Sequence, residues 1–106
     1  MLSEEVNREQ ISEALPGVIE GLIESLDVGQ TFDEAINEMA ATPDNVLAEA
    51  FGTMMAEVKG GVPRREAIQK MAQRLDVPEL TALVEGLVGA DEEGKPIEEV
   101  LKAHLK

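Results

Sequence analysis

One short phrase occurs three times in this chain, and the repeat constrains the fold more than any other feature. The copies begin at Gly29, Gly61 and Gly94, so they lie 32 and 33 residues apart. In each copy a glutamate stands five positions after the glycine, and two apolar residues follow it. Apolar residues also stand ten, seven and six positions before each glycine: Ile19, Leu22 and Ile23; Phe51, Met54 and Met55; Val84, Leu87 and Val88. Repetition with this period is typical of a helical hairpin used several times.

Apolar residues follow helical spacing along almost the whole chain. In the stripe from Leu15 to Leu26 they recur three and four positions apart, and no window shows the strict alternation of a half-buried strand. We therefore predict an all-α protein, a compact antiparallel bundle of about six helices built from helix–glycine turn–helix repeats. Pro16 is expected to kink or divide the first helical stretch. The predicted helical segments are 5–14, 15–28, 32–41, 43–59, 63–75, 77–92 and 96–106.

Local chemistry predicts where these helices begin and end. Thr31 with Glu34, and Asp76 with Glu79, have the spacing of a capping box. Glycines that follow long helices can adopt the left-handed conformation that closes a helix. These are Gly29, Gly60, Gly61 and Gly94. Proline stands at a plausible first helical position in Thr42-Pro43 and Val62-Pro63.

The charge balance excludes several classes of partner. The net charge is −13, from 22 acidic and 9 basic residues. Such a surface repels nucleic-acid phosphates, and it repels anionic lipids unless basic segments outside the chain attract them. No stretch reaches the ~18 apolar residues that span a bilayer. We expect a soluble segment of a longer protein, because the helical pattern is still running at Lys106. It divides into a helical lead-in over 1–11 and one domain over 12–106.

The sequence offers no catalytic constellation, so we predict a protein that is not an enzyme and has no cofactor. His104 is the single histidine and there is no cysteine, which leaves no ordinary zinc site. No serine lies in a nucleophile elbow. The acidic run before Gly94 does not have the spacing of a calcium-binding EF-hand loop, and a weak divalent-cation site of converging carboxylates stays an alternative.

Two other features allow a contact role. Arg64 and Arg65 stand in the first turn of a predicted helix, where positive charge is unfavourable, so a partner or a nearby carboxylate is expected to compensate them. Four methionines fall on apolar stripes, and we predict that they fill the core. They are Met39, Met54, Met55 and Met71.

The ordered motifs resemble the type II secretion system F domain over residues 12–106. Leu15-Pro16 begins a helix that ends at Gly29, and the phrase Phe32-Asp-Glu-Ala-Ile36 opens the next. The segments Leu47–Phe51, Glu57–Pro63 and Glu66–Ile68 continue the match. Val77-Pro-Glu-Leu80 and Gly94-Lys-Pro-Ile97 look most like the tight-adherence branch of that family.

The resemblance implies a scaffold on the cytoplasmic face of the bacterial or archaeal cytoplasmic membrane. Proteins of this family are platform proteins of type II secretion, type IV pilus and tight-adherence systems, with membrane helices outside the module. They are thought to couple a secretion ATPase to the assembly of pilin or pseudopilin subunits, often as oligomers, so a second copy is a further candidate partner. From charge clustering we predict these partner contacts: Asp91, Glu92, Glu93, Glu98, Glu99, Arg64 and Arg65.

Two other functions remain open at this point. The first is a free-standing α-helical repeat adaptor, whose period would suit tetratricopeptide repeats although the aromatic markers of that repeat are missing. The second is an enzyme or a metal-dependent module.

Overall fold

Three helical hairpins make up the structure, one for each copy of the repeat. The computed structural model describes residues 2–41 and 43–105, with the side chains of residues 8–41 and 43–105. The described residues form helices and no strand, which confirms the all-α prediction. The helices are α1 (Leu2–Asp27), α2 (Phe32–Ala41), α3 (Val46–Lys59), α4 (Arg64–Leu75), α5 (Pro78–Glu93) and α6 (Ile97–Ala103).

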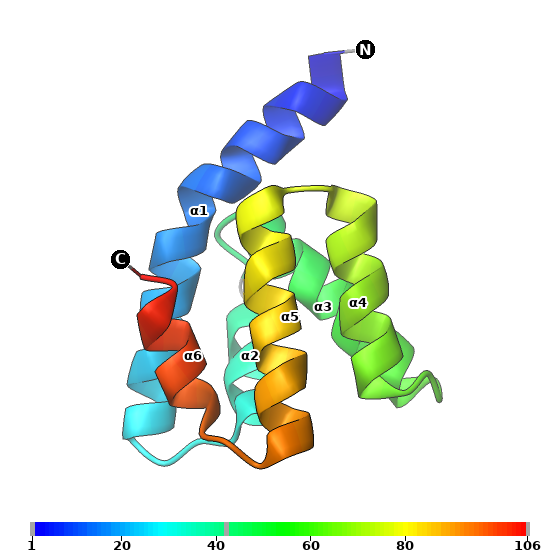
Figure 1. Ribbon diagram of the computed structural model, residues 1–106. Coiled ribbons are helices and arrows are strands. Elements are labelled where there is room, and N and C mark those ends of the chain that lie inside the picture. Colours follow the sequence, from blue (N-terminus) through cyan, green and yellow to red (C-terminus); the bar gives the residue numbers. More distant parts are fainter. Residues whose placement is uncertain (1, 42, 106) are drawn as a thin grey trace.

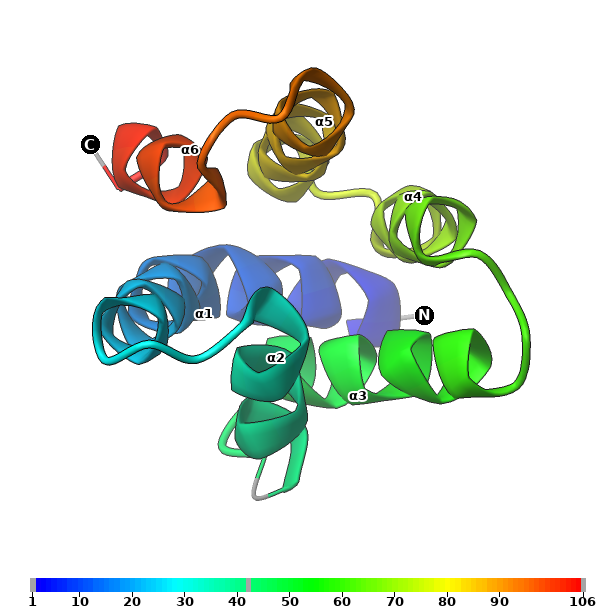
Figure 2. The same ribbon diagram turned by 90° about the horizontal axis from the view of Figure 1, so that it is seen from below.

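The helices are arranged around a shared interior. Helices α4, α5 and α6 lie side by side as one layer, and α1 and α3 lie across from them (Figure 2). Helix α2 packs against α1 and α3. Neighbours α4 and α5, and α5 and α6, run antiparallel (Figure 1). The predicted bundle is confirmed, and its Cα radius of gyration of 13.0 Å is that of a folded chain of this length. Helix α3 runs across the direction of the helices in the α4–α6 layer (Figure 2). It packs against α1, α2 and α4.

The predicted apolar stripes meet in one continuous core. Ile36, Phe51 and Leu101 are completely buried, although they come from three different hairpins. Among the described side chains, no polar or charged residue is buried. Met54, Met55 and Met71 fill this core as expected, whereas Met39 is only partly buried at its edge. Burial of this apolar surface is the main force that holds the hairpins together.

The three glycine turns have the same backbone hydrogen bonds. Gly29, Gly61 and Gly94 have φ values of 99°, 113° and 72°, in the left-handed region. In each turn the glycine N–H donates to the carbonyl three residues earlier, and the next N–H donates to the carbonyl five residues before it. This is the Schellman arrangement, which satisfies the last carbonyls of the longer helix. Gly60, by contrast, keeps a right-handed conformation with φ −82°.

The starts of α2 and α3 have side-chain caps. Thr31 and Glu34 form the predicted capping box, since each side chain accepts a hydrogen bond from the other's backbone N–H, at 3.1 and 2.9 Å. The sequence predicted that the third helix begins at Pro43, and this prediction is wrong. Thr42, the residue before that proline, lies outside the described residues. Helix α3 begins at Val46 because the side chain of Asn45 accepts from the N–H of Ala48 at 2.8 Å.

The second predicted capping box is absent. Asp76 closes α4 in the left-handed conformation, with φ 56°, and its N–H donates to the carbonyl of Ala72. This leaves Val77 as the residue before α5, and Val77 has no side chain that can cap. Glu79 instead accepts a hydrogen bond from Ser12 Oγ of α1 at 2.8 Å. A bond to its own backbone N–H and this Ser12 bond lower the pKa of Glu79.

The first helix continues through Pro16. The segments predicted as 5–14 and 15–28 form the single helix α1, so the predicted division is wrong, while the axis of α1 bends part-way along (Figure 1). Proline removes one backbone bond, but the ring of Pro16 is exposed and Leu15 and Val18 beside it are buried. Packing on both sides therefore keeps the helix intact despite the lost bond. The predicted boundary between residues 11 and 12 falls inside α1 and stays a prediction.

Helix α6 approaches α5 closely at a glycine. A Cβ atom placed on Gly86 would lie 2.9 Å from Cγ1 of Val100 and 3.4 Å from Cε1 of His104. His104 ends α6 half-buried, and its Nδ1 lies 3.0 Å from the carbonyl of Val100. The ring thus has a packing role at the end of α6.

Candidate functional site

All three glycine turns lie at one end of the molecule, which we call the glycine-turn end (Figure 1). It comprises the residues around Gly29, Gly61 and Gly94. The predicted contact residues gather there, since the first turn of α4, the last turn of α5 and the first turn of α6 all face this end. The sequence predicted the residues, but only the fold brings the second and third hairpins together at this point.

The two arginines are compensated by carboxylates of the chain itself. Nη2 of Arg64 lies 2.6 Å from Oδ2 of Asp33 on α2, and Nη1 of Arg65 lies 2.5 Å from Oε2 of Glu92 on α5. The sequence predicted that either a partner or a nearby carboxylate compensates the two arginines, and the structure has a nearby carboxylate for each. These pairs are partly exposed, so each contributes little to stability, but together they connect all three hairpins.

A small pocket lies between these ion pairs. Its volume is about 300 Å³. Apolar side chains form its floor, and the predicted contact residues Arg64, Arg65, Asp91 and Glu92 form its edge. The floor residues are Phe32, Val58, Ile68, Leu87, Val88 and Ile97. A charged edge around an apolar hollow suits an apolar side chain of a protein partner.

A second charged cluster joins the end of α1 to α6. The carboxyl group of Asp27 shares a hydrogen bond with Glu98, and Oε2 of Glu98 lies 3.0 Å from Nζ of Lys102. This hydrogen bond raises the pKa of Asp27 and lowers that of Glu98, while the bond to Glu98 raises the pKa of Lys102. The predicted contact residue Glu98 therefore already has two partners within the chain.

The remaining predicted residues are solvent-facing. Asp91, Glu93 and Glu99 are exposed, and Glu93 pairs with Lys95 across the last glycine turn at 3.0 Å. Within the described residues, no group of three or more histidine, cysteine or acidic side chains is placed to hold a metal ion. Asp91, Glu93 and Glu99 thus form a charged, solvent-exposed surface at the glycine-turn end.

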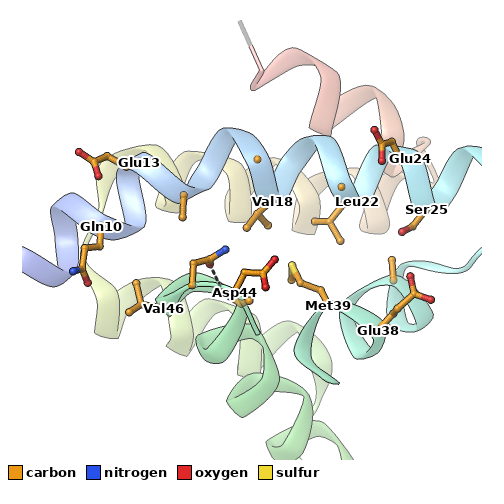
Figure 3. Close-up of a pocket in the computed structure, with 16 residues that line it drawn as sticks. Gln10, Glu13, Val18, Leu22, Glu24, Ser25, Glu38, Met39, Asp44 and Val46 are labelled. Atoms are coloured by element: carbon orange, nitrogen blue, oxygen red, sulfur yellow. Dashed lines mark hydrogen bonds between the residues drawn. The ribbon is translucent and has the colours of Figure 1, made fainter. Parts of the chain in front are cut away.

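A groove between α1 and the α2–α3 side was not predicted. Its volume is about 960 Å³, and Figure 3 shows Val18 and Leu22 pointing from α1 toward Met39 and Asp44 on the opposite wall. The remaining lining residues are Gln10, Glu13, Ala14, Gly17, Gly21, Glu24, Ser25, Ala35, Glu38, Asn45, Val46 and Ala48. The available signal was the pair Gly17 and Gly21, which weaken the interior of a helix without ending it.

None of the described helices is long and apolar enough to cross a membrane.

A comparison with known families decides the identity. The family model described as "Type II secretion system (T2SS), protein F" matches residues 18–105, which include all three glycine turns. The chain belongs to this family. The predicted family is therefore confirmed, whereas the tight-adherence branch stays a prediction. Searches of curated proteins and of solved structures found no match.

Membership in the protein F family gives the chain a role in secretion or pilus-assembly machinery. Work within such machinery implies protein partners. The pocket at the glycine-turn end and the groove beside α1 are two hollows in the described structure.

Proposed function

We propose that this chain is a non-enzymatic scaffold domain of a membrane platform protein. On the cytoplasmic face of the membrane, it couples a secretion ATPase to the assembly of pilin or pseudopilin subunits. The family match over residues 18–105 supports a place in this machinery. The glycine-turn end supports docking as the activity, because it gathers charged and apolar contact groups from three hairpins.

The convergence at the glycine-turn end is the observation that carries the proposal. Protein interfaces combine an apolar centre with a polar, hydrated rim. The 300 Å³ pocket offers such a centre, and Asp91, Glu93 and Glu99 offer exposed charge beside it. The Arg64–Asp33 and Arg65–Glu92 pairs connect the surrounding helix ends, and the apolar core beneath fixes their positions. A partner therefore meets a surface that is already formed, which lowers the entropy lost on binding.

The tight-adherence branch is the subtype that we propose. Its support is the pair of phrases Val77–Leu80 and Gly94–Ile97. Both phrases open helices, since Pro78 is the first residue of α5 and Pro96 stands directly before α6. A second copy of the chain is proposed as an additional partner within the platform.

The adaptor alternative has less support. In a solenoid of helical repeats, each repeat contacts only its neighbours and leaves an extended concave surface. Here α1 of the first hairpin packs against both α5 and α6 of the third. The repeats thus close into a bundle, and the described helices do not form the open, extended array that defines such adaptors.

Charge reversal at the glycine-turn end tests the proposal. Asp91, Glu93 and Glu99 are replaced together by lysine in the full-length platform protein. We expect association with the secretion ATPase, measured by co-purification and light scattering, to weaken by about tenfold or more. Pilus assembly or secretion in cells should fall with it.

The matched control reverses Glu20, Glu49 and Glu85, which are exposed on α1, α3 and α5 outside both pockets. It changes the net charge by the same amount. If the two variants bind the secretion ATPase with the same affinity, the glycine-turn end has no specific role in that association.

A further inference from the structure

The groove between α1 and the α2–α3 side has an apolar floor. Val18 and Leu22 of α1 and Ala35 and Ala48 of the opposite wall are almost fully buried at its base. Met39 and Val46 are partly exposed above them. In Figure 3, Val18 and Leu22 face Met39 across the open space. Met39 and Val46 are therefore the apolar side chains that the groove leaves partly exposed.

Two glycines widen this groove on the α1 side. A Cβ atom added to Gly17 or to Gly21 would meet no atom within 4 Å. Packing inside the chain therefore does not require glycine at either position. Each glycine nevertheless weakens α1 relative to alanine. The missing side chains leave space in which the backbone of another segment can approach α1.

All the charged residues of the groove have the same sign. Its lining contains Glu13, Glu24, Glu38 and Asp44 and no lysine, arginine or histidine. Figure 3 shows Glu38 on the α2 side and the carboxylate of Asp44 beside Met39, whereas Glu13 and Glu24 point outward from α1, away from Met39 and Asp44. At the glycine-turn end arginines pair with carboxylates, but the lining of the groove contains carboxylates and no cationic side chain.

We propose that this groove binds a basic amphipathic helix of a partner protein. The apolar face of that helix would cover Met39 and Val46. Its lysines or arginines would pair with Glu38 and Asp44, and longer side chains would extend toward Glu13 and Glu24 at the outer edge of α1. The lining of α1 extends from Gln10 to Ser25. At 1.5 Å per residue this is about 22 Å, which corresponds to a bound helix of about four turns. Helix-in-groove recognition has this geometry.

Charge and packing favour this occupant over two others. An anionic lipid surface is repelled by the four carboxylates. A second copy of the chain offers α4 as its most basic helix, but the apolar face of α4 is buried in its own core through Ala67, Ile68 and Met71. That helix cannot also cover the apolar floor of a neighbour's groove.

Peptide binding tests the proposal without any secretion component. The probe is a fluorescein-labelled helical peptide of about 18 residues, with leucine and alanine on one face and lysine on the other. Its partner probe replaces every lysine with glutamine. We expect the lysine peptide to bind the chain at least about tenfold more tightly than the glutamine peptide, measured by fluorescence anisotropy.

Filling the groove separates specific binding from general attraction. Gly17→Leu with Gly21→Leu adds side chains where there is open space, so the fold should tolerate the change. The matched control is Gly89→Leu on α5, where an added Cβ atom also meets nothing within 4 Å and which lines neither pocket. Binding of the lysine peptide should weaken by about tenfold in the double variant and stay within about twofold in the control.

Neutralising the rim gives a second readout. Glu38→Gln with Asp44→Asn should weaken peptide binding severalfold more than Glu49→Gln with Glu85→Gln, which removes the same charge outside the groove. The proposal is wrong if both pairs of substitutions weaken peptide binding equally. It is also wrong if the backbone amide NMR shifts that change on peptide addition belong to the glycine-turn end. Because the glycine-turn residues are unchanged in these variants, a negative result leaves the ATPase-contact proposal untouched.

Discussion

At the scale of single residues, glycines inside helices differ in what a methyl group would meet. A Cβ atom at Gly86 would approach Val100 to 2.9 Å, whereas at Gly17, Gly21 and Gly89 it would meet nothing within 4 Å. Val100 is β-branched and cannot easily move aside. Glycine is therefore required by packing at one of these positions and not at the others.

Alanine substitutions at Gly86 and Gly89 should change the stability of the domain in opposite directions. Gly86→Ala is expected to destabilise the domain by about 1–3 kcal/mol, because it overpacks the α5–α6 contact. Gly89→Ala, one turn away on the same helix, should stabilise it by about 0.5–1 kcal/mol through helix propensity. Urea unfolding followed by circular dichroism measures both changes. A stabilising Gly86→Ala would show that α6 shifts freely against α5.

Asp27 and Glu98 provide a pH-dependent prediction. The hydrogen bond to Glu98 raises the pKa of Asp27, so the folded state holds that proton more tightly than the unfolded state does. The stabilisation is complete below the ordinary range of aspartate and is lost as the pH rises through the raised value. In Asp27→Asn, the amide donates the same hydrogen bond at every pH. The variant should therefore be more stable than the native chain at about pH 7, with the difference shrinking toward about pH 4.

Thermal unfolding at both pH values checks this expectation. Glu85→Gln, an exposed change on α5, serves as the control for loss of one negative charge. If Asp27→Asn and Glu85→Gln show the same pH dependence, the shared hydrogen bond has no measurable effect.

At the scale of elements, the three Schellman turns predict a matched comparison. Gly61→Ala and Gly94→Ala should each cost about 1–2 kcal/mol, because alanine is strained in the left-handed conformation. Gly60→Ala is the neighbouring control, since Gly60 is right-handed and its added Cβ would make only ordinary contacts at 3.5 Å. Equal effects at Gly60 and Gly61 in unfolding experiments would contradict the assigned turn geometry.

The sequence predicted elements well where local chemistry decides them. The three turns depend on a glycine and the Thr31 cap depends on residues three positions apart, so both were predictable. Two errors concern local choices between neighbouring residues: Asn45 rather than Pro43 determines the start of α3, and the left-handed Asp76 closes α4 instead of capping α5. The third error depends on tertiary contacts, because packing on both sides keeps α1 intact through Pro16.

The candidate site was predictable only in part for the same reason. Charge clustering along the chain indicated residues near Gly94, and helix-end electrostatics indicated the two arginines. That Arg65 pairs with Glu92 over a shared pocket follows from the placement of α4 beside α5. The groove beside α1 combines residues from α1, α2 and α3, and no local pattern indicated it.

At the scale of the whole molecule, the net charge and the ion pairs have opposite effects on the stability of the folded state. The chain has a net charge of −13, and the ion pairs between its described side chains are partly or largely exposed. Exposed pairs each contribute about 0–1 kcal/mol, whereas repulsion among unbalanced carboxylates extends over the whole surface. We therefore expect the melting temperature to rise when sodium chloride is increased from about 0.05 to about 0.5 M.

Calorimetry or circular dichroism measures this rise. Glu20→Lys with Glu49→Lys reduces the net charge and should reduce the salt effect. A melting temperature that falls with added salt would indicate that the ion pairs outweigh the repulsion.

The packing of α1 against α6 has a mechanical consequence. In an open array of repeats, units can detach one after another from either end. Here the first and last hairpins touch, so neither can leave without exposing the interior of the other. The domain should therefore lose its structure in a single cooperative step, and a force applied at one hairpin is resisted by all of them together.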